Sequence, residues 1–188
     1  MKTELRIMAW ALSCFVSGAA IAASGDPGDV AGTQGAGGQI QFTGTITDTS
    51  CNVDTAHTDE HVRLGTWASS YFTAAGIETN KQPFHISVKD CPDSVKKVAV
   101  RFDGKTVEND KNLLAINDGP GTATGVAIQL YEDDQQQKVT LGQVTKEYDV
   151  KPGDSDTELT FYADYHATSD EVTVGEANAS VNFNMVYN

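Results

Sequence analysis

The side chains best suited to chemistry lie in one short polar stretch. His57 and His61 stand four residues apart beside Asp54, Asp59 and Glu60, a spacing that on a helix could present several metal ligands together. The stretch has no apolar face with which a helix could pack, so a solvated loop is the stronger interpretation. We therefore expect no metal centre here.

Other patterns of catalytic or binding residues are missing from the sequence. It contains no G-x-S-x-G elbow, no phosphate-binding glycine loop and no His-Glu-x-x-His pair. The acidic pairs Asp133–Asp134 and Asp154 with Asp156 lack the spaced oxygen ligands of a calcium loop, so they are interpreted as surface charge. The sequence predicts neither a catalytic residue nor a cofactor, and hence a protein that is not an enzyme.

Length and composition narrow the class of protein further. The 188 residues suffice for one ordinary domain, and the formal net charge of −13 argues against binding to nucleic acid or to an anionic membrane. The chain has 20 Thr and 17 Val against 8 Leu. Branched side chains of this kind favour pleated sheet over helix, so we expect an all-β fold.

The first 22 residues have the pattern of an export signal. Lys2 and Arg6 form a basic start, residues 7–16 are almost all apolar, and Ala20-Ile21-Ala22 offers the small residues that a signal peptidase requires. The apolar run is about half of the ~20 residues that span a bilayer, so we expect cleavage, after Ala22 or Ala23, and no membrane span.

Two cysteines remain after the leader, which contains Cys14, is removed. An even pair in an exported chain favours a disulfide between Cys51 and Cys91. Neither cysteine belongs to a C-x-x-C pair or has a nearby histidine, which weighs against a metal ligand or a nucleophile. Closing this loop should stabilise the fold by roughly 4 kcal/mol in the chain-entropy model.

Alternating apolar and polar residues predict several short strands. The runs begin at Ile40, Phe84, Val98, Val126 and Leu159, and clusters of Gly, Asp and Asn separate them. Residues 68–77 could form one short helical turn. Several short strands with turns between them are typical of a two-sheet sandwich.

The two ends of the mature chain contrast in pattern. Residues 23–38 are rich in glycine and almost free of bulky side chains, which predicts a flexible arm in the isolated subunit. Residues 177–187 alternate without a break to the end of the chain. This pattern predicts a strand with an uncovered edge, because no later segment of the chain follows it. Its apolar face carries Val181, Phe183, Met185 and Tyr187.

Five stretches carry more specific patterns, in order and over nearly the whole mature chain. They are 37–44 with 49–54, 83–91, 124–130, 159–165, and 175–179 with the penultimate Tyr187. Together they resemble subunits of the chaperone–usher family of type 1 pilus-like fimbriae. Asp164 departs from that pattern, because a basic residue is common at its position.

The resemblance implies an incomplete immunoglobulin-like β-sandwich that lacks its final strand and is completed by a donor strand. A periplasmic chaperone would lend a strand first, and the arm of the neighbouring pilin subunit would replace it at the outer-membrane usher. Gly175 and Tyr187 are recognition positions for the chaperone in this resemblance, which places Val181, Phe183 and Met185 on the same groove edge.

The predicted function is that of a structural subunit of an adhesive surface fibre, exported through the periplasm to the cell surface. We expect residues 1–22 to be the signal, 23–38 the donor-strand extension and 39–188 the sandwich domain. Alternate positions of the arm would face the neighbour: Val30, Gly32, Gln34, Ala36 and Gly38. The main alternative is a secreted carbohydrate-binding sandwich.

Overall fold

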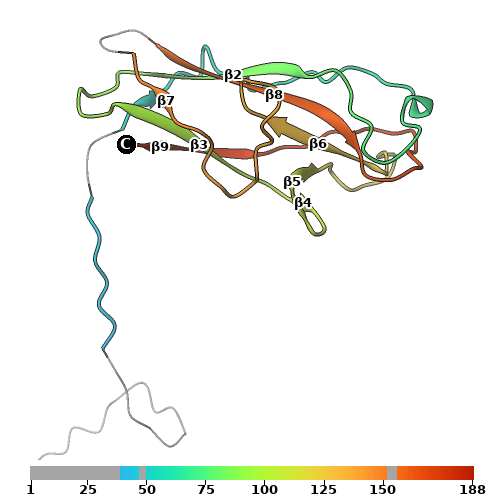
Figure 1. The fold of residues 1–188 in the computed structure, drawn as a ribbon, viewed down its shortest axis with the longest axis horizontal. Coiled ribbons are helices and arrows are strands. Elements are labelled where there is room, and N and C mark those ends of the chain that lie inside the picture. The colour runs from blue at the N-terminus through green and yellow to red at the C-terminus, as the bar shows by residue number, and fades with distance from the viewer. Residues whose placement is uncertain (1–38, 47–49, 152–155) are drawn as a thin grey trace, which may run out of the picture. The chain divides into compact units, whose positions relative to one another are not determined.

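The computed structural model describes residues 39–46, 50–151 and 156–188. Thr45–Asn188 forms one compact unit, and residues 39–44 lie outside it. Among the described residues the elements are strands, apart from the single 3-10 turn η1 (Ser69–Tyr71), so the all-β prediction is confirmed (Figure 1). No helix in these ranges has the length and apolar character needed to cross a membrane. The predicted signal and arm lie outside the described residues.

The described strands form two antiparallel sheets. The larger sheet has six strands in the order β1 (Asn52–Val53), β2 (Gln82–Lys89), β8 (Thr157–Ala167), β6 (Val126–Tyr131), β5 (Asp110–Ala115) and β4 (Thr106–Val107). The smaller sheet has three, in the order β7 (Tyr148–Asp149), β3 (Lys97–Asp103) and β9 (Asn182–Tyr187). The two-sheet sandwich expected from the sequence is therefore present.

Aromatic rings join the two sheets in the core. Phe161 of β8 is fully buried and lies between Phe84 of β2 and Phe102 of β3, with ring centroids 5.6 and 5.1 Å away. Tyr148 of β7 approaches the same ring at 5.8 Å. Edge-to-face and offset rings of this kind add to the stabilisation that burial of apolar area provides.

The strongest sequence patterns became the strands of the core. The runs from Phe84, Val98, Val126 and Leu159 are β2, β3, β6 and β8, and η1 lies within the predicted helical turn. The strand predicted from Ile40 is wrong as far as the structure describes it, since residues 39–46 contribute to no strand. Strand β5 has two adjacent leucines, Leu113 and Leu114, and no clean alternation, so sequence periodicity did not reveal it.

Strand β6 is buried on both of its faces. All six residues of β6 are buried, although only one face of the strand looks into the sandwich. The segment after β6 pairs with the end of that strand, where the Val139 amide donates to the Leu130 carbonyl at 2.9 Å, and its Val139 and Leu141 side chains belong to the buried core. Gln129 Nε2 donates to the Asn112 and Leu130 carbonyls, both at 2.9 Å, which satisfies its buried amide.

Candidate functional site: an open apolar groove

Strand β9 is an edge strand with one partner. Its residues pair with β3, with Phe183 opposite Phe102 and Met185 opposite Val100. The strand begins at Asn182, later than the 177–187 run predicts, because its partner β3 ends at Asp103 opposite Asn182. The pairing of the described strands thus leaves the second edge of β9 open.

An apolar hollow of about 460 Å³ opens beside this edge. Its floor is the core itself, with Phe84, Phe102, Leu114, Ile128, Leu130 and Ala163. Residues 58–62 with Leu64 form one wall, and residues 179–181 with Phe183 form the other. Core side chains that a complete sandwich would cover therefore line an accessible hollow.

A second hollow of about 500 Å³ continues the first along the same chain segments. One wall advances from Leu64 to residues 65–67, and the opposite wall continues through residues 172–178. The floor moves two residues along β6, from Ile128 to Val126, and two along β8, from Ala163 to Tyr165. The two hollows, with walls 58–72 and 172–183, are called the groove below.

Hydrogen bonds attach each wall of the groove to a different part of the sandwich. On one side Asp59 N donates to the His85 carbonyl at 2.9 Å, and this bond attaches the 58–72 wall to β2. On the other side Asn117 N donates to the Asn178 carbonyl at 2.7 Å, and Tyr165 Oη donates to the Ala177 carbonyl at 2.9 Å. None of these hydrogen bonds joins one wall to the other across the groove, so an added strand could lie between the walls.

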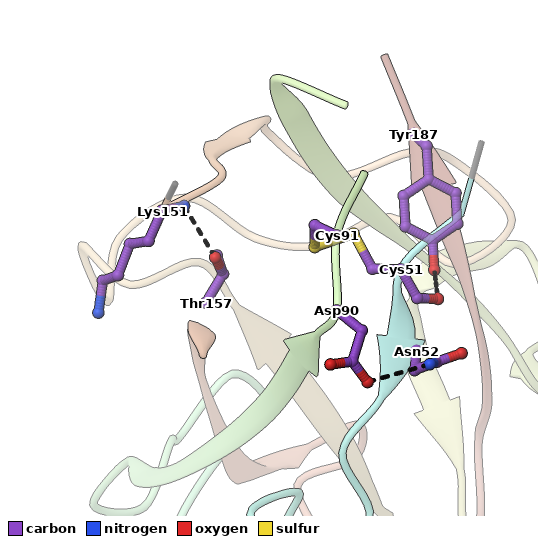
Figure 2. The surroundings of a disulfide bond; sticks show 7 residues. All are labelled: Cys51, Asn52, Asp90, Cys91, Lys151, Thr157 and Tyr187. Atoms are coloured by element: carbon purple, nitrogen blue, oxygen red, sulfur yellow. Dashed lines mark hydrogen bonds between the residues drawn. A yellow bond between two sulfur atoms is a disulfide. The ribbon is translucent and has the colours of Figure 1, made fainter. Parts of the chain in front are cut away.

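The disulfide lies beside the C-terminal end of β9. Cys51 and Cys91 are bonded, as predicted, and the bond joins the chain just before β1 to the chain just after β2 (Figure 2). Tyr187 Oη donates to the Cys51 carbonyl at 3.1 Å (Figure 2). Asn188 extends the β3–β9 pairing, since its carbonyl accepts from Lys97 N and its amide donates to the Lys97 carbonyl, both at 3.0 Å. The end of β9 is therefore fixed.

Gly175 has a structural reason to be glycine. A Cβ built on this residue would lie 2.4 Å from Ala123 N and from the Thr122 carbonyl carbon. The approaching atoms are backbone and cannot turn aside as a side chain could, so only glycine allows the 172–178 wall to come this close.

The structure brings three of the five predicted edge residues to the groove. Gly175 lines the second hollow, and Val181 and Phe183 line the first. Met185 and Tyr187 are half-buried on the same strand face but line neither hollow. The opposite wall, with His61, Val62 and Trp67, was not predicted; these residues belong to no strand and show no periodicity that could have revealed them.

The predicted donor residues of the arm lie outside the described residues, but the chain just beyond them is described. Ile40 and Phe42 are 77% and 90% exposed, and Ile46 is also fully exposed. These three side chains alternate with polar ones, and no strand includes them. Within the described residues nothing covers these three large apolar side chains.

The polar stretch singled out for chemistry forms a charged cluster. His57 Nδ1 lies 2.5 Å from Asp54 Oδ2, and Lys89 Nζ lies 3.0 Å from Asp54 Oδ1. The hydrogen bond from His57, then that from Lys89, lowers the pKa of Asp54 to about 2, and Asp54 in turn raises the pKa of His57. Asp156 completes a set of three possible metal ligands, but the Lys89 ammonium already neutralises the central carboxylate.

Comparison with known proteins agrees with this architecture. Residues 40–188 match the family model described as fimbrial protein. The chain is 37% identical over 151 residues to the long polar fimbria protein A of Salmonella typhimurium, covering 80% of this chain and 83% of that protein. It is 35% identical to the type-1 fimbrial protein, A chain, of Salmonella typhi, over the full length of both.

Solved structures show the same fold. The type I fimbria protein BPSL1626 of Burkholderia pseudomallei is 36% identical, with a TM-score of 0.54 over 78% of this chain and 94% of that one. The P pilus rod subunit PapA, at 20% identity, superposes with a TM-score of 0.61 over 73% of this chain and 99% of that one. The resemblance seen in the sequence is confirmed, and the chain belongs to the fimbrial protein family.

Proposed function

We propose that this chain is a structural subunit of a surface fimbria that polymerises by donor-strand exchange. The observation that carries the proposal is the groove, in which the core residues of a sandwich line a hollow beside the open edge of β9. An extended segment of the next subunit fills the groove and adds a strand to that edge. Main-chain hydrogen bonds then supply affinity, and alternate side chains supply register.

The donated segment extends through Ile40, Phe42 and Ile46. The glycine-rich positions from Val30 to Gly38, considered alone, offer few apolar side chains to an apolar floor. Ile40, Phe42 and Ile46 share the parity of those positions and are exposed. Burying such side chains contributes roughly 1.5–3 kcal/mol each. They therefore supply most of the attachment, and the positions before them extend the same strand.

Two variants separate these parts of the donor. Deletion of residues 26–36 removes the glycine-rich positions, whereas Ile40→Asp with Phe42→Asp keeps them and charges the apolar face. We expect few and short fibres from the deletion variant, because it shortens the donated strand, and none from the double variant, as seen by electron microscopy. Thr43→Asp, on the opposite parity, is the matched control and should assemble. Fibres from the double variant would contradict the assignment of the donor.

A periplasmic chaperone covers the groove until assembly, and an outer-membrane usher directs the exchange. An uncovered apolar edge is an aggregation hazard that a bound chain removes. Phe183→Asp places a charge on the groove edge, and we expect loss of both the periplasmic chaperone complex and the fibre. Asn184→Asp puts the same charge on the exposed face of β9, opposite Arg101; it loses only the exposed hydrogen bond that Asn184 donates to Asp103 and should leave both intact. Equal yields of complex from the two variants would refute this role for the edge.

A further inference from the structure

A carboxylate that shares its nearest cation with another acid is buried beneath the outer face of the large sheet. Asp164 of β8 has 0% of its surface exposed. Tyr131 of β6, itself 1% exposed, donates its hydroxyl toward both Asp164 oxygens, at 3.2 and 3.3 Å. The nearest ammonium, Lys81 Nζ, lies 3.8 Å from Oδ2.

The positively charged side chains around Asp164 lie closer to another acid, Glu78, than to Asp164. The carboxylate of Glu78 lies 3.3 Å from Lys81 Nζ and 3.4 Å from Lys138 Nζ. His166 Nδ1 also lies 3.4 Å from this carboxylate. Lys81 additionally sits 4.1 Å from the centre of the Tyr131 ring. These groups come from every element around Asp164: the segment before β2, β6, the segment after β6, and β8 itself. Asp164 thus faces a neighbouring carboxylate whose cations are already engaged.

We propose that Asp164 is a proton-binding site of the folded subunit, which makes the fold more stable as the medium changes from neutral to mildly acidic. A neutral carboxyl group can stay buried beside Tyr131, whereas the charged form must be removed from water with only a shared lysine nearby. The site is independent of the groove, so it does not depend on the proposed assembly mechanism.

The direction of the pH dependence follows from the environment of the group. Burial, then the charge of Glu78, raises the pKa of Asp164 from 3.8 to about 7. Since the folded state holds the proton more tightly than the unfolded chain, the stabilisation is complete below about pH 4 and is lost as the pH rises through about 7.

The decisive experiment is urea unfolding of the mature disulfide-bonded chain between pH 5 and pH 8. Asp164→Asn preserves the shape of the group without the titrating proton. The unfolding equilibrium constant of the wild-type chain, divided by that of Asp164→Asn, should rise about fifty-fold from pH 5 to pH 7. Asp118→Asn, at an exposed acid paired with Lys105, is the control and should give a constant ratio. A constant ratio for Asp164→Asn overturns the proposal.

Infrared spectroscopy tests the proposal without relying on that variant. The folded wild-type chain should show the C=O band of a protonated carboxyl group that disappears with a midpoint near pH 7. Glu78→Gln removes the neighbouring negative charge and should shift this midpoint to lower pH. Burial also raises the pKa of Glu132, but Glu132 lies in the Lys146–Tyr148 environment and should not respond to Glu78→Gln. A wild-type chain without the band, or a band insensitive to Glu78→Gln, overturns the assignment.

Discussion

The centre of the large sheet and the edge of the small one are built from similar side chains but differ in their cover. Strand β6 has a strand on each side, and all its residues are buried. Strand β9 alternates more regularly, yet none of its residues is fully buried. Alternation in the sequence therefore predicts that a strand has an apolar face, not that this chain covers it.

The two regions therefore differ in whether this chain alone provides the contacts that stabilise them. Around Phe161 the chain supplies every neighbour of the buried ring, so the stabilisation belongs to the single subunit. Along the groove the floor is apolar and no described strand covers it, so in the proposed assembly part of the stabilisation comes from a second chain. Substitutions in the two regions should consequently affect different measurements.

The largest effect on folding is expected at the closed centre. Phe161→Ala removes a fully buried ring and should lower the free energy of unfolding by about 3–5 kcal/mol, measured by urea denaturation of the mature chain. The same truncation at Phe42, which is 90% exposed, should leave unfolding nearly unchanged while weakening attachment to a neighbour. A large loss of stability from Phe42→Ala would end the distinction between the two regions.

The disulfide tests how strongly the groove depends on its fixed end. Replacing Cys51 and Cys91 by serine should lower the free energy of unfolding by about 2–5 kcal/mol. Tyr187, which donates to the Cys51 carbonyl, should then become more accessible to solvent, since the chain that accepts its hydroxyl is no longer tied. Tyrosine fluorescence quenching would measure this, and unchanged quenching would show that β9 is fixed without the bond.

The close approach at Gly175 should produce a smaller and more local effect. Gly175→Ala introduces a Cβ against the backbone of Thr122 and Ala123 and should cost about 1–3 kcal/mol. Gly142→Ala also replaces a loop glycine of positive φ, 81°, but its Cβ would meet nothing within 4 Å, which makes it the control for backbone strain alone. Hydrogen exchange should show opening of the Asn117–Asn178 hydrogen bond in Gly175→Ala and not in the control.

The smallest expected effect is electrostatic and lies at the Asp54–His57 pair, in which Asp54 is buried and His57 is exposed. Because Asp54 raises the pKa of His57, the charged pair stabilises the fold below about pH 6.5 and this contribution is lost as the pH rises through the folded-state value. His57→Gln should therefore be slightly less stable than wild type at pH 5.5 and equal to it at pH 8.5. High salt should reduce the difference, and a difference that grows at pH 8.5 would exclude this origin.

Several features were predictable because they depend on neighbours along the chain. Strands β2, β3, β6 and β8 follow from period-two alternation, since successive side chains of a strand point to opposite faces. The disulfide follows from counting cysteines after the leader. The edge position of Phe183 was expected from the resemblance to fimbrial subunits, which implies a missing strand beside the C-terminal strand, and not from the regular alternation, which is typical of a central strand.

Tertiary structure decided what the local pattern could not. The run from Ile40 alternates as well as β2 does but contributes to no described strand, because alternation does not by itself decide whether a segment pairs with another strand. The wall at His61 and Val62 carries no periodic signal, and hydrogen bonds of the adjacent Thr58 and Asp59 attach it to β2.

By itself the sequence determined an all-β chain with one disulfide, an apolar C-terminal strand and the family to which it belongs. It did not determine that Asp164 would be buried while Lys81 and Lys138 lie closest to Glu78. Nor did it determine that the backbone at Thr122 would leave no room for a side chain at Gly175. Those features arise from segments far apart in the sequence, whose meeting depends on how the whole chain packs rather than on the residues at either site.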